Sequence, residues 1–449
     1  MRDELIRKLS KPVPRYTSYP TAPHFHEGVT AQTYAGWLSA LPPDTNLSLY
    51  LHVPFCDRLC WFCGCHTKQV LRYEPIAAYL RGLHHELQTV AKALEGRGRV
   101  SQIHLGGGSP SMLKSNDLVV LALEIKQHFG IKDDLEFSIE IDPNDMTPDR
   151  YEGFEAARVT RASIGVQDFD PRVQQAINRV QTSEQTREVV ERLREIGVAS
   201  INLDVLYGLP FQTQESLGTT IDAVLGMRPE RVALFGYAHV PWMKTHQKMI
   251  DEAVLPGVVE RYHQARFAAE RLVAAGYDPI GMDHFALPQD SLAVASRGGR
   301  LRRNFQGYTT DEAPALIGLG ASSIGSLPQG YVQNVVPTAE YLRLATAGGL
   351  ATIRGFALSD EDRMRRYVIE ELMCNSFVSV SELERRFGSA SAPLVEDMRA
   401  LTALDTEDLV TFDGQRLAMT ERGRPFVRAV AAVFDSYLQV GQKRHSVAV

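Results

Sequence analysis

Four of the five cysteines in this 449-residue chain lie in one short segment that follows a predicted strand. Cys56, Cys60 and Cys63 form a C-x3-C-x2-C pattern, and Cys65 comes two residues later. Disulfide bonds are a poor interpretation, because cysteines this close together would close only very small loops. Three thiolates on one loop can instead bind one face of an iron–sulfur cubane and leave the fourth iron open to another ligand.

A structural zinc ion is the alternative chemistry for the same loop. It needs a fourth ligand, for which Cys65, His52 and His66 are the candidates. Zinc ribbons more often use two C-x2-C pairs separated by a longer gap, so the spacing favours the cluster and leaves zinc open. The fifth cysteine, Cys374, stands apart from the others and is predicted to be a core residue.

The elements that position this loop are predicted to be alternating strands and helices. β-Rich runs occur at residues 47–53, 100–105, 135–141, 162–167, 200–206 and 231–237. The helix after the fourth run is the clearest, because Thr182 and Gln185 form a capping-box pattern and Gly197 ends it. Strands that alternate with helices predict a parallel sheet. Six units are too few for a complete eight-stranded barrel, so we predict an α/β fold with an open, TIM-like partial (βα)6 barrel. A doubly wound sheet is the alternative.

Distinctive polar and glycine residues fall at the carboxyl ends of these strands, where barrels build their active sites. They are Gly106, Gly107, Gly108, Ser109, Glu140, Asp142, Gln167, Asp168, Asp204, Tyr207 and His239. The glycines let main-chain groups approach a ligand closely. An acid among apolar residues, such as Asp204, needs a partner or a hydroxylated ligand such as a ribose. Arg179 suits a ligand carboxylate or a loop cap. These positions together favour the cluster over zinc.

Two further regions flank the predicted barrel of residues 47–350. Residues 1–46 are predicted to be an N-terminal arm and a lead-in helix, since four prolines make residues 12–25 extended. Residues 351–449 are predicted to be a mainly helical domain with helices at 361–375, 381–387, 393–401 and from Thr420, and a winged-helix-like hairpin at Asp413-Gly414. Residues 350–449 carry thirteen basic and fifteen acidic side chains, which argues against DNA binding.

The composition excludes several classes of protein. An apolar fraction of 44% is that of a globular core, and no apolar run is long enough for a membrane span. With a formal charge of −6, the chain has no general attraction to nucleic acid or anionic lipid. An anionic substrate must therefore meet local Arg or Lys residues. We expect a cytoplasmic protein, and nothing in the sequence demands an oligomer, so we expect a monomer.

In these features the sequence resembles the radical-SAM enzymes and, within them, the oxygen-independent coproporphyrinogen III oxidase family. The likeness covers nearly the whole chain. It is carried by the cysteine loop and by PRYTSYPTA at 14–22, GGGSP at 106–110, GVQDF at 165–169, YGLP at 207–210, YAH at 237–239, GMDHFA at 281–286 and RNFQGYTT at 303–310.

The resemblance implies a [4Fe–4S] cluster on Cys56, Cys60 and Cys63, with Cys65 in the motif but not a ligand. S-adenosylmethionine would chelate the open iron, and a second molecule would lie beside it. The residues implied for the first molecule are Tyr50, Gly107, Glu140 and Ile324, and those for the second are Phe62, Gly108, Ser109, Gln167, Arg179, Asp204 and Ala238.

The implied reaction is the oxidative decarboxylation, without oxygen, of two propionates of coproporphyrinogen III to vinyl groups, as in haem biosynthesis. We expect Arg15, Arg302 and Arg303 to meet the propionates. The reaction also requires an electron donor and a final acceptor, which no motif identifies. Gly236 stands where Asn is expected, and a lost amide would weaken the second cofactor site or the substrate site. A radical methyltransferase or a haem-trafficking relative is the alternative, although haem-trafficking relatives typically lack the fourth cysteine and the proline-rich arm.

Overall fold

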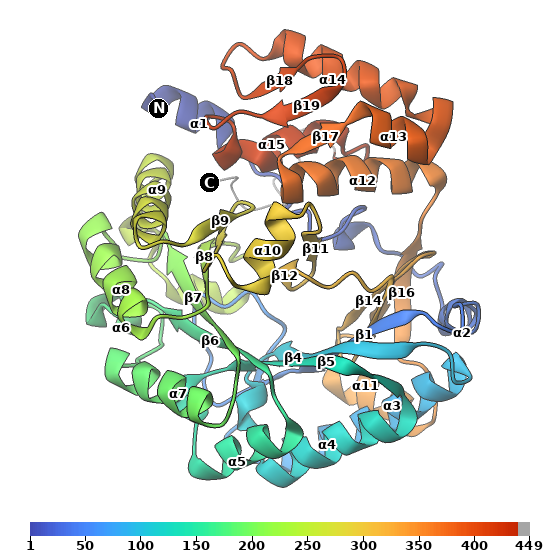
Figure 1. Cartoon of the computed structure of the whole chain (residues 1–449). Helices are drawn as coiled ribbons and strands as arrows, with labels where there is room; N and C mark the ends of the chain where they lie inside the picture. Colours follow the sequence, from blue (N-terminus) through green and yellow to red (C-terminus); the bar gives the residue numbers. More distant parts are fainter. Residues whose placement is uncertain (439–449) are drawn as a thin grey trace.

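A twelve-stranded sheet forms the centre of the computed structural model, which describes residues 1–438 (Figure 1). Six parallel strands lie side by side in sequence order: β1 (Asn46–Val53), β4 (Arg99–Gly107), β5 (Gly130–Ile141), β6 (Arg161–Gln167), β7 (Ser200–Tyr207) and β8 (Arg231–Gly236). The six predicted strands are therefore confirmed. Their order never reverses, whereas a doubly wound sheet has a point where it does, so the partial barrel is the correct alternative.

Helices that follow these strands lie along one side of the sheet (Figure 1). They are α3 (Glu74–Leu94), α4 (Ser115–His128), α5 (Pro148–Ala157), α7 (Ser183–Glu195), α8 (Gln214–Met227) and α9 (Val258–Ala274), with the short α6 (Pro171–Ala176) between β6 and α7. In α7 the Thr182 hydroxyl accepts a hydrogen bond from the Gln185 amide, as predicted. The reciprocal half of the capping box does not form, because the Gln185 side chain donates to the Pro143 carbonyl. Gly197, with φ of +89°, follows the end of the helix.

The sheet continues beyond the six units at both edges. Next to β1 lie β13 (Ala315–Leu319), which is parallel, and then the antiparallel strands β14 (Ile324–Leu327), β15 (Gly330–Asn334) and β16 (Thr352–Ala357). Next to β8 lie β10 (His284–Ala286) and β9 (Asp278–Ile280). Helices α10 (Ser291–Arg297) and α11 (Thr338–Thr346) and the hairpin of β11 (Arg302–Asn304) and β12 (Gly307–Thr309) complete this extension.

The C-terminal region contains the predicted helices and hairpin. The helices are α12 (Asp360–Asn375), α13 (Val380–Phe387) and α14 (Ala392–Leu404), and β17 (Phe377–Ser379) joins the hairpin of β18 (Val410–Phe412) and β19 (Arg416–Met419). The prediction of a helix from Thr420 was wrong. Helix α15 (Val427–Ala431) begins only at Val427, after a 3-10 turn at Arg424–Phe426. Pro425 lacks an amide hydrogen and disfavours helix at the residue before it. Residues 439–449 of the predicted domain lie outside the described residues.

The N-terminal arm packs into the C-terminal region. It begins with a helix that was not predicted, α1 (Asp3–Leu9), is extended for most of residues 12–25 with one 3-10 turn at Ala22–His24, and leads into the predicted helix α2 (Ala31–Ser39). Ile6, Tyr16 and Tyr19 are buried in one apolar cluster with residues of α12, α13 and α14. The Tyr16 hydroxyl donates to Asp435 over 3.0 Å, and the Tyr19 hydroxyl lies 2.9 Å from that of Ser436. The division of the chain at residue 46 stays a prediction.

Among the described residues, no helix has both the length and the apolar composition to cross a membrane.

Candidate active site

The cysteine loop follows β1 and lies between two short strands of two residues each. Cys56 belongs to β2 (Phe55–Cys56), which runs parallel to β3 (Lys68–Gln69), so the loop is closed at its base. Segments distant in sequence hold its main chain. The Trp61 amide donates to the Ile177 carbonyl over 2.9 Å, and the His246 Nε2 group donates to the Cys63 carbonyl over 2.7 Å.

All three predicted ligand cysteines line one cavity of about 230 Å³ at the carboxyl ends of the strands. The other predicted residues that line it are Phe62, Gly107, Gly108, Ser109, Glu140, Gln167, Arg179 and Asp204. The structure thus brings together residues from β4, β5, β6 and β7 with the loop, as barrel topology requires.

Three predicted cofactor residues do not line this cavity. The Tyr50 hydroxyl lies 2.9 Å from Nδ1 of His52, and its ring stacks on His104 beside the cavity. The Ala238 carbonyl accepts a hydrogen bond from Gln247, whose side-chain amide also donates to the Phe62 carbonyl, so this residue adjoins the cysteine loop. Ile324 lies on β14 and packs against the apolar cluster of Phe25, Tyr331 and Leu358.

The glycine turn after β4 packs directly on the start of the cysteine loop. Gly108 donates to the Val53 carbonyl over 2.9 Å, and Ser109 donates to the Phe55 carbonyl over 2.7 Å. A Cβ atom on Gly108 would lie 2.5 Å from the Phe55 oxygen. Gly107 has φ of +109°, which a side chain would strain. The glycines are therefore required to set the distance between strand β4 and the residue that precedes Cys56.

Arg179 connects the loop to the ends of two strands. Its Nη1 lies 2.9 Å from a carboxylate oxygen of Asp142 and 3.8 Å from the Cys60 sulfur, and its Nη2 donates to the Gly165 carbonyl. Burial raises the pKa of the Cys60 thiol, and the charge of Arg179 opposes this rise. Nε of Arg179 is buried with no hydrogen-bond partner among the described residues. A donor is thus left beside the cavity for a ligand acceptor.

Two carboxyl groups at the cavity, those of Glu140 and Asp204, have pKa values shifted in opposite directions. Burial alone would raise the pKa of Glu140, but hydrogen bonds from His104 and the Gly107 amide outweigh it and lower the pKa. Burial raises the pKa of Asp204 to about 6, although Asn202 donates to it over 2.7 Å. Glu140 is therefore a stable anion that suits an ammonium group, while Asp204 suits hydroxyl groups.

Comparison with known proteins decides the family. Residues 50–224 match the model of the Radical SAM superfamily, and residues 358–426 match that of the HemN C-terminal domain. The chain is 47% identical over 437 residues to an oxygen-independent coproporphyrinogen III oxidase of Bradyrhizobium diazoefficiens, with 97% of both chains covered. It is 39% identical to one of Pseudomonas aeruginosa, with 97% of this chain and 95% of the relative covered. The chain belongs to the oxygen-independent coproporphyrinogen III oxidase family.

The fold agrees with this assignment. The solved structure of the Escherichia coli coproporphyrinogen III oxidase HemN, described as a radical-SAM enzyme, superimposes with a TM-score of 0.91 at 38% identity and covers 98% of this chain and 99% of that chain.

The donor set fits the cluster of this family better than zinc. Within residues 1–438, no three His, Cys, Asp or Glu side chains are grouped around one point that could hold a single metal ion. Zinc needs four ligand atoms within about 2.0–2.3 Å of one centre. A cubane is larger and takes each thiolate on a different iron. Three of the four cysteines that line the cavity have the C-x3-C-x2-C spacing, and each can bind a different iron of a cluster.

The predicted substrate arginines of this oxidase-family chain occupy two different settings. Arg15 donates to the Gly236 carbonyl over 2.7 Å, and Arg303 donates to the Arg15 carbonyl over 3.3 Å. Arg302 instead lies near Glu371 on α12. Burial raises the pKa of Glu371, and the charge of Arg302 reduces this rise. A Cβ atom on Gly236 would lie 2.9 Å from the Tyr207 ring. Glycine, which stands here in place of the expected Asn, therefore allows Tyr207 to pack closely.

Several residues at the site were not predicted, and His104 is one of them. His104 on β4 lies 3.3 Å from Glu140 and 2.6 Å from the Ser138 hydroxyl. Strand alternation was the available signal, because His104 is two residues before Gly106 and faces the same side of the sheet.

Proposed function

We propose that this protein catalyses the oxygen-independent oxidative decarboxylation of coproporphyrinogen III to protoporphyrinogen IX, a step of haem and porphyrin biosynthesis. Each of two propionate side chains gives one hydrogen atom to a 5′-deoxyadenosyl radical, then loses carbon dioxide, passes one electron to an acceptor and becomes a vinyl group. The observation that carries this proposal is the C-x3-C-x2-C loop at the strand-end cavity, in a chain that matches members of this oxidase family along 97% of its length.

The three cysteines would hold the cofactor of this reaction. A [4Fe–4S] cluster held by Cys56, Cys60 and Cys63 would supply the one electron needed to cleave S-adenosylmethionine into methionine and a 5′-deoxyadenosyl radical. Cys65 is exposed on the same loop, and we assign it no ligand role. The protein fixes the loop through the glycine turn and through its hydrogen bonds to the segments around Ile177 and His246.

The chain's own groups bind and orient S-adenosylmethionine. Glu140 can accept from the ammonium group of the cluster-bound molecule. For a second molecule, Arg179 can donate Nε to the carboxylate and Asp204 can accept from the ribose hydroxyls. We assign Tyr50, Gly107 and Ile324 with Glu140 to the cluster-bound molecule. A second molecule would use Phe62, Gly108, Ser109, Gln167 and Ala238 with Arg179 and Asp204. Arg15, Arg302 and Arg303 are our candidates for the propionates, and we propose that the protein acts as a cytoplasmic monomer.

The test is an anaerobic assay with reconstituted protein, coproporphyrinogen III, S-adenosylmethionine and a strong reductant. The expected products are protoporphyrinogen IX, carbon dioxide and 5′-deoxyadenosine. A reaction without coproporphyrinogen III and a reaction with Cys60→Ala are the controls. Formation of 5′-deoxyadenosine with no vinyl product, or of a methylated product, would refute the decarboxylase assignment and keep the radical chemistry.

A further inference from the structure

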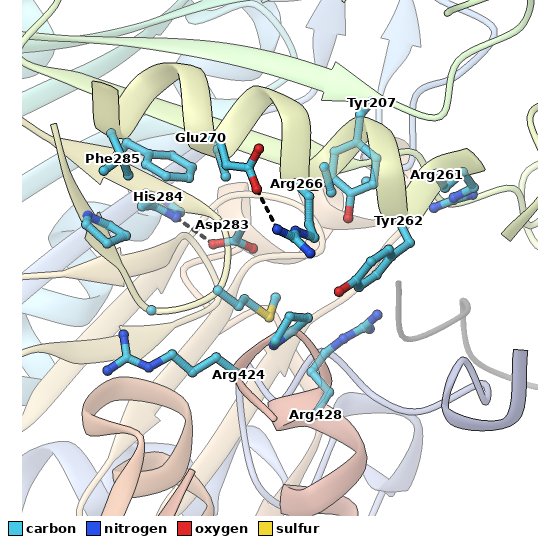
Figure 2. A pocket seen from close by; sticks show the side chains of 18 of the residues that line it. Tyr207, Arg261, Tyr262, Arg266, Glu270, Asp283, His284, Phe285, Arg424 and Arg428 are labelled. Carbon is cyan, nitrogen blue, oxygen red and sulfur yellow. Dashed lines mark hydrogen bonds and ion pairs between the residues drawn. The ribbon is translucent and has the colours of Figure 1, made fainter. Parts of the chain in front are cut away.

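A second cavity, larger than the one at the cysteines, lies beside the carboxyl ends of β7 and β8. Its volume is about 550 Å³. Helix α9, the turn between β9 and β10, the N-terminal arm and the 3-10 turn at Arg424–Phe426 enclose it. Figure 2 shows the side chains of α9 on one side and those of Arg424 and Arg428 on the other. Its lining includes Arg15, Tyr207, Tyr237 and residues 281–285, which belong to motifs named above, but none of the proposed cofactor residues.

Five arginines line this cavity, which we call the arginine cavity, and they come from three parts of the chain: Arg15, Arg261, Arg266, Arg424 and Arg428. Two of them have acidic partners close by in sequence. Arg266 lies 2.6 Å from a carboxylate oxygen of Glu270, and Arg424 lies 3.2 Å from one of Glu421. These two pairs are mostly exposed, so they neutralise the rim of the cavity and not its interior.

Arg261 differs from the two rim arginines. Its Nε is buried with no hydrogen-bond partner among the described residues, and no ion pair within residues 1–438 involves it. Burial lowers the pKa of Arg261, and the positive charge of Arg15 lowers it further. The acid of the interior, Asp283, already pairs with His284 over 2.7 Å (Figure 2). Among the described residues, the charge of Arg261 at the inner wall therefore has no carboxylate partner.

The remaining wall is apolar. Ala265, Ala269 and Val273 on α9 line the cavity together with Met282 and Phe285. Guanidinium groups bind carboxylates through paired hydrogen bonds, and they gain most from this where water is excluded. A ligand that matches both walls carries carboxylates on a large apolar ring system.

Both cavities are lined in part by residues of β7. Asp204 lines the cysteine cavity, and Tyr207, three residues later on β7, lines the arginine cavity. The charge of His284, another lining residue, also acts on Asp204. The two cavities therefore each have a lining residue near the carboxyl end of the same strand.

We propose that the arginine cavity binds propionate carboxylates of the tetrapyrrole substrate, with Arg261 as the main binding residue and Arg15 beside it. This inference rests on the proposed function, since it assigns a site to that substrate. In this inference the arginine cavity is a subsite that binds some of the propionates and so holds the macrocycle, while the remaining propionates reach the cysteine cavity.

The test measures binding apart from turnover. The probe is coproporphyrin III, the oxidised form of the substrate, which keeps its four propionates and whose fluorescence reports binding to the reconstituted protein. Arg261→Gln should weaken binding roughly tenfold or more, because it removes a charged hydrogen-bond donor. Arg261→Lys should retain part of the affinity. Arg271→Gln is the matched control, since Arg271 lies on the same helix, donates to Asp222 over 2.9 Å and is outside the cavity.

A second variant keeps the inference testable if Arg261→Gln does not fold. Ala269→Glu adds a carboxylate to the apolar wall without removing an arginine, and it should weaken binding by a similar factor. Iron content and circular dichroism show which variants are folded. If the wild-type protein binds the probe, Arg261→Gln weakens that binding, and the wild type makes no vinyl product, the subsite is supported and the proposed reaction is refuted. If the wild type forms the product and the folded variants bind the probe with unchanged affinity and keep the same KM, the subsite is refuted and the proposed reaction is supported.

Discussion

Replacing Gly108 by Ala tests whether the glycine turn positions the cysteine loop. The new Cβ atom would lie 2.5 Å from the Phe55 oxygen, 2.7 Å from the Phe55 nitrogen and 2.8 Å from the Val53 oxygen. All three are main-chain atoms, so no side chain can rotate away. The clash must separate strand β4 from the residue that precedes Cys56.

The expected cost follows from these contacts. Overpacking in a tight region costs about 1–3 kcal/mol. The two hydrogen bonds from Gly108 and Ser109 to the loop contribute about 0.5–1.5 kcal/mol each. We therefore expect Gly108→Ala to lower the free energy of unfolding by about 2–6 kcal/mol. It should also reduce the iron bound after anaerobic reconstitution, because Cys56 is displaced from the other two thiolates.

Gly64→Ala is the matched control, because Gly64 lies between Cys63 and Cys65 and an added Cβ there has no neighbour within 4 Å. It should retain both iron and stability. The assays are iron and sulfide per chain, the visible absorbance of the cluster and the urea unfolding midpoint. Full iron content and an unchanged midpoint in Gly108→Ala would show that the glycine turn does not position the loop.

Three other predictions follow from the structure. Changing any one of the three ligand cysteines to Ala should abolish the brown iron–sulfur absorbance, whereas Cys65→Ala should keep it; loss of iron in Cys65→Ala alone would refute the ligand assignment. Tyr19→Ala should destabilise the protein by about 3–5 kcal/mol, because its ring is 2% exposed in the apolar cluster shared with the C-terminal helices, and an unchanged thermal midpoint would contradict this. Burial raises the pKa of the Asp168 carboxyl group to about 6 from an ordinary 3.8, so between these pH values the folded state binds a proton that the unfolded state does not. The free energy of unfolding should therefore fall by up to about 3 kcal/mol as pH rises from about 4 to about 6. Asp168→Asn should lack this slope in urea midpoints measured against pH, and an identical slope would show that other groups cause it.

Local patterns were enough to predict much of the barrel. The six strands and the start of α7 were predicted correctly, because hydrophobic periodicity and helix caps act between residues close in sequence. Strand alternation also signalled His104, although it was overlooked. The strand order then followed from the rule that sequential βα units lie side by side.

The cysteine loop shows how far such reasoning reaches at the site. Residue types and spacing predicted the iron–sulfur cluster, and topology predicted that Glu140, Arg179 and Asp204 would face it. Tyr50 and Ile324 were implied by resemblance alone, and the structure places both outside the cavity lining.

The tertiary structure decided the contacts between segments that are far apart in sequence. Tyr16 of the arm meets Asp435, and Arg15 meets Gly236. The arginine cavity likewise joins the arm, helix α9 and the C-terminal region. No local pattern encodes such pairings, because each depends on how separately formed units pack once their apolar faces are buried. The sequence by itself determined the strands, the cap of α7 and the chemistry of the cysteine loop. The packing of the arm and of the C-terminal region determined where the arginines gather.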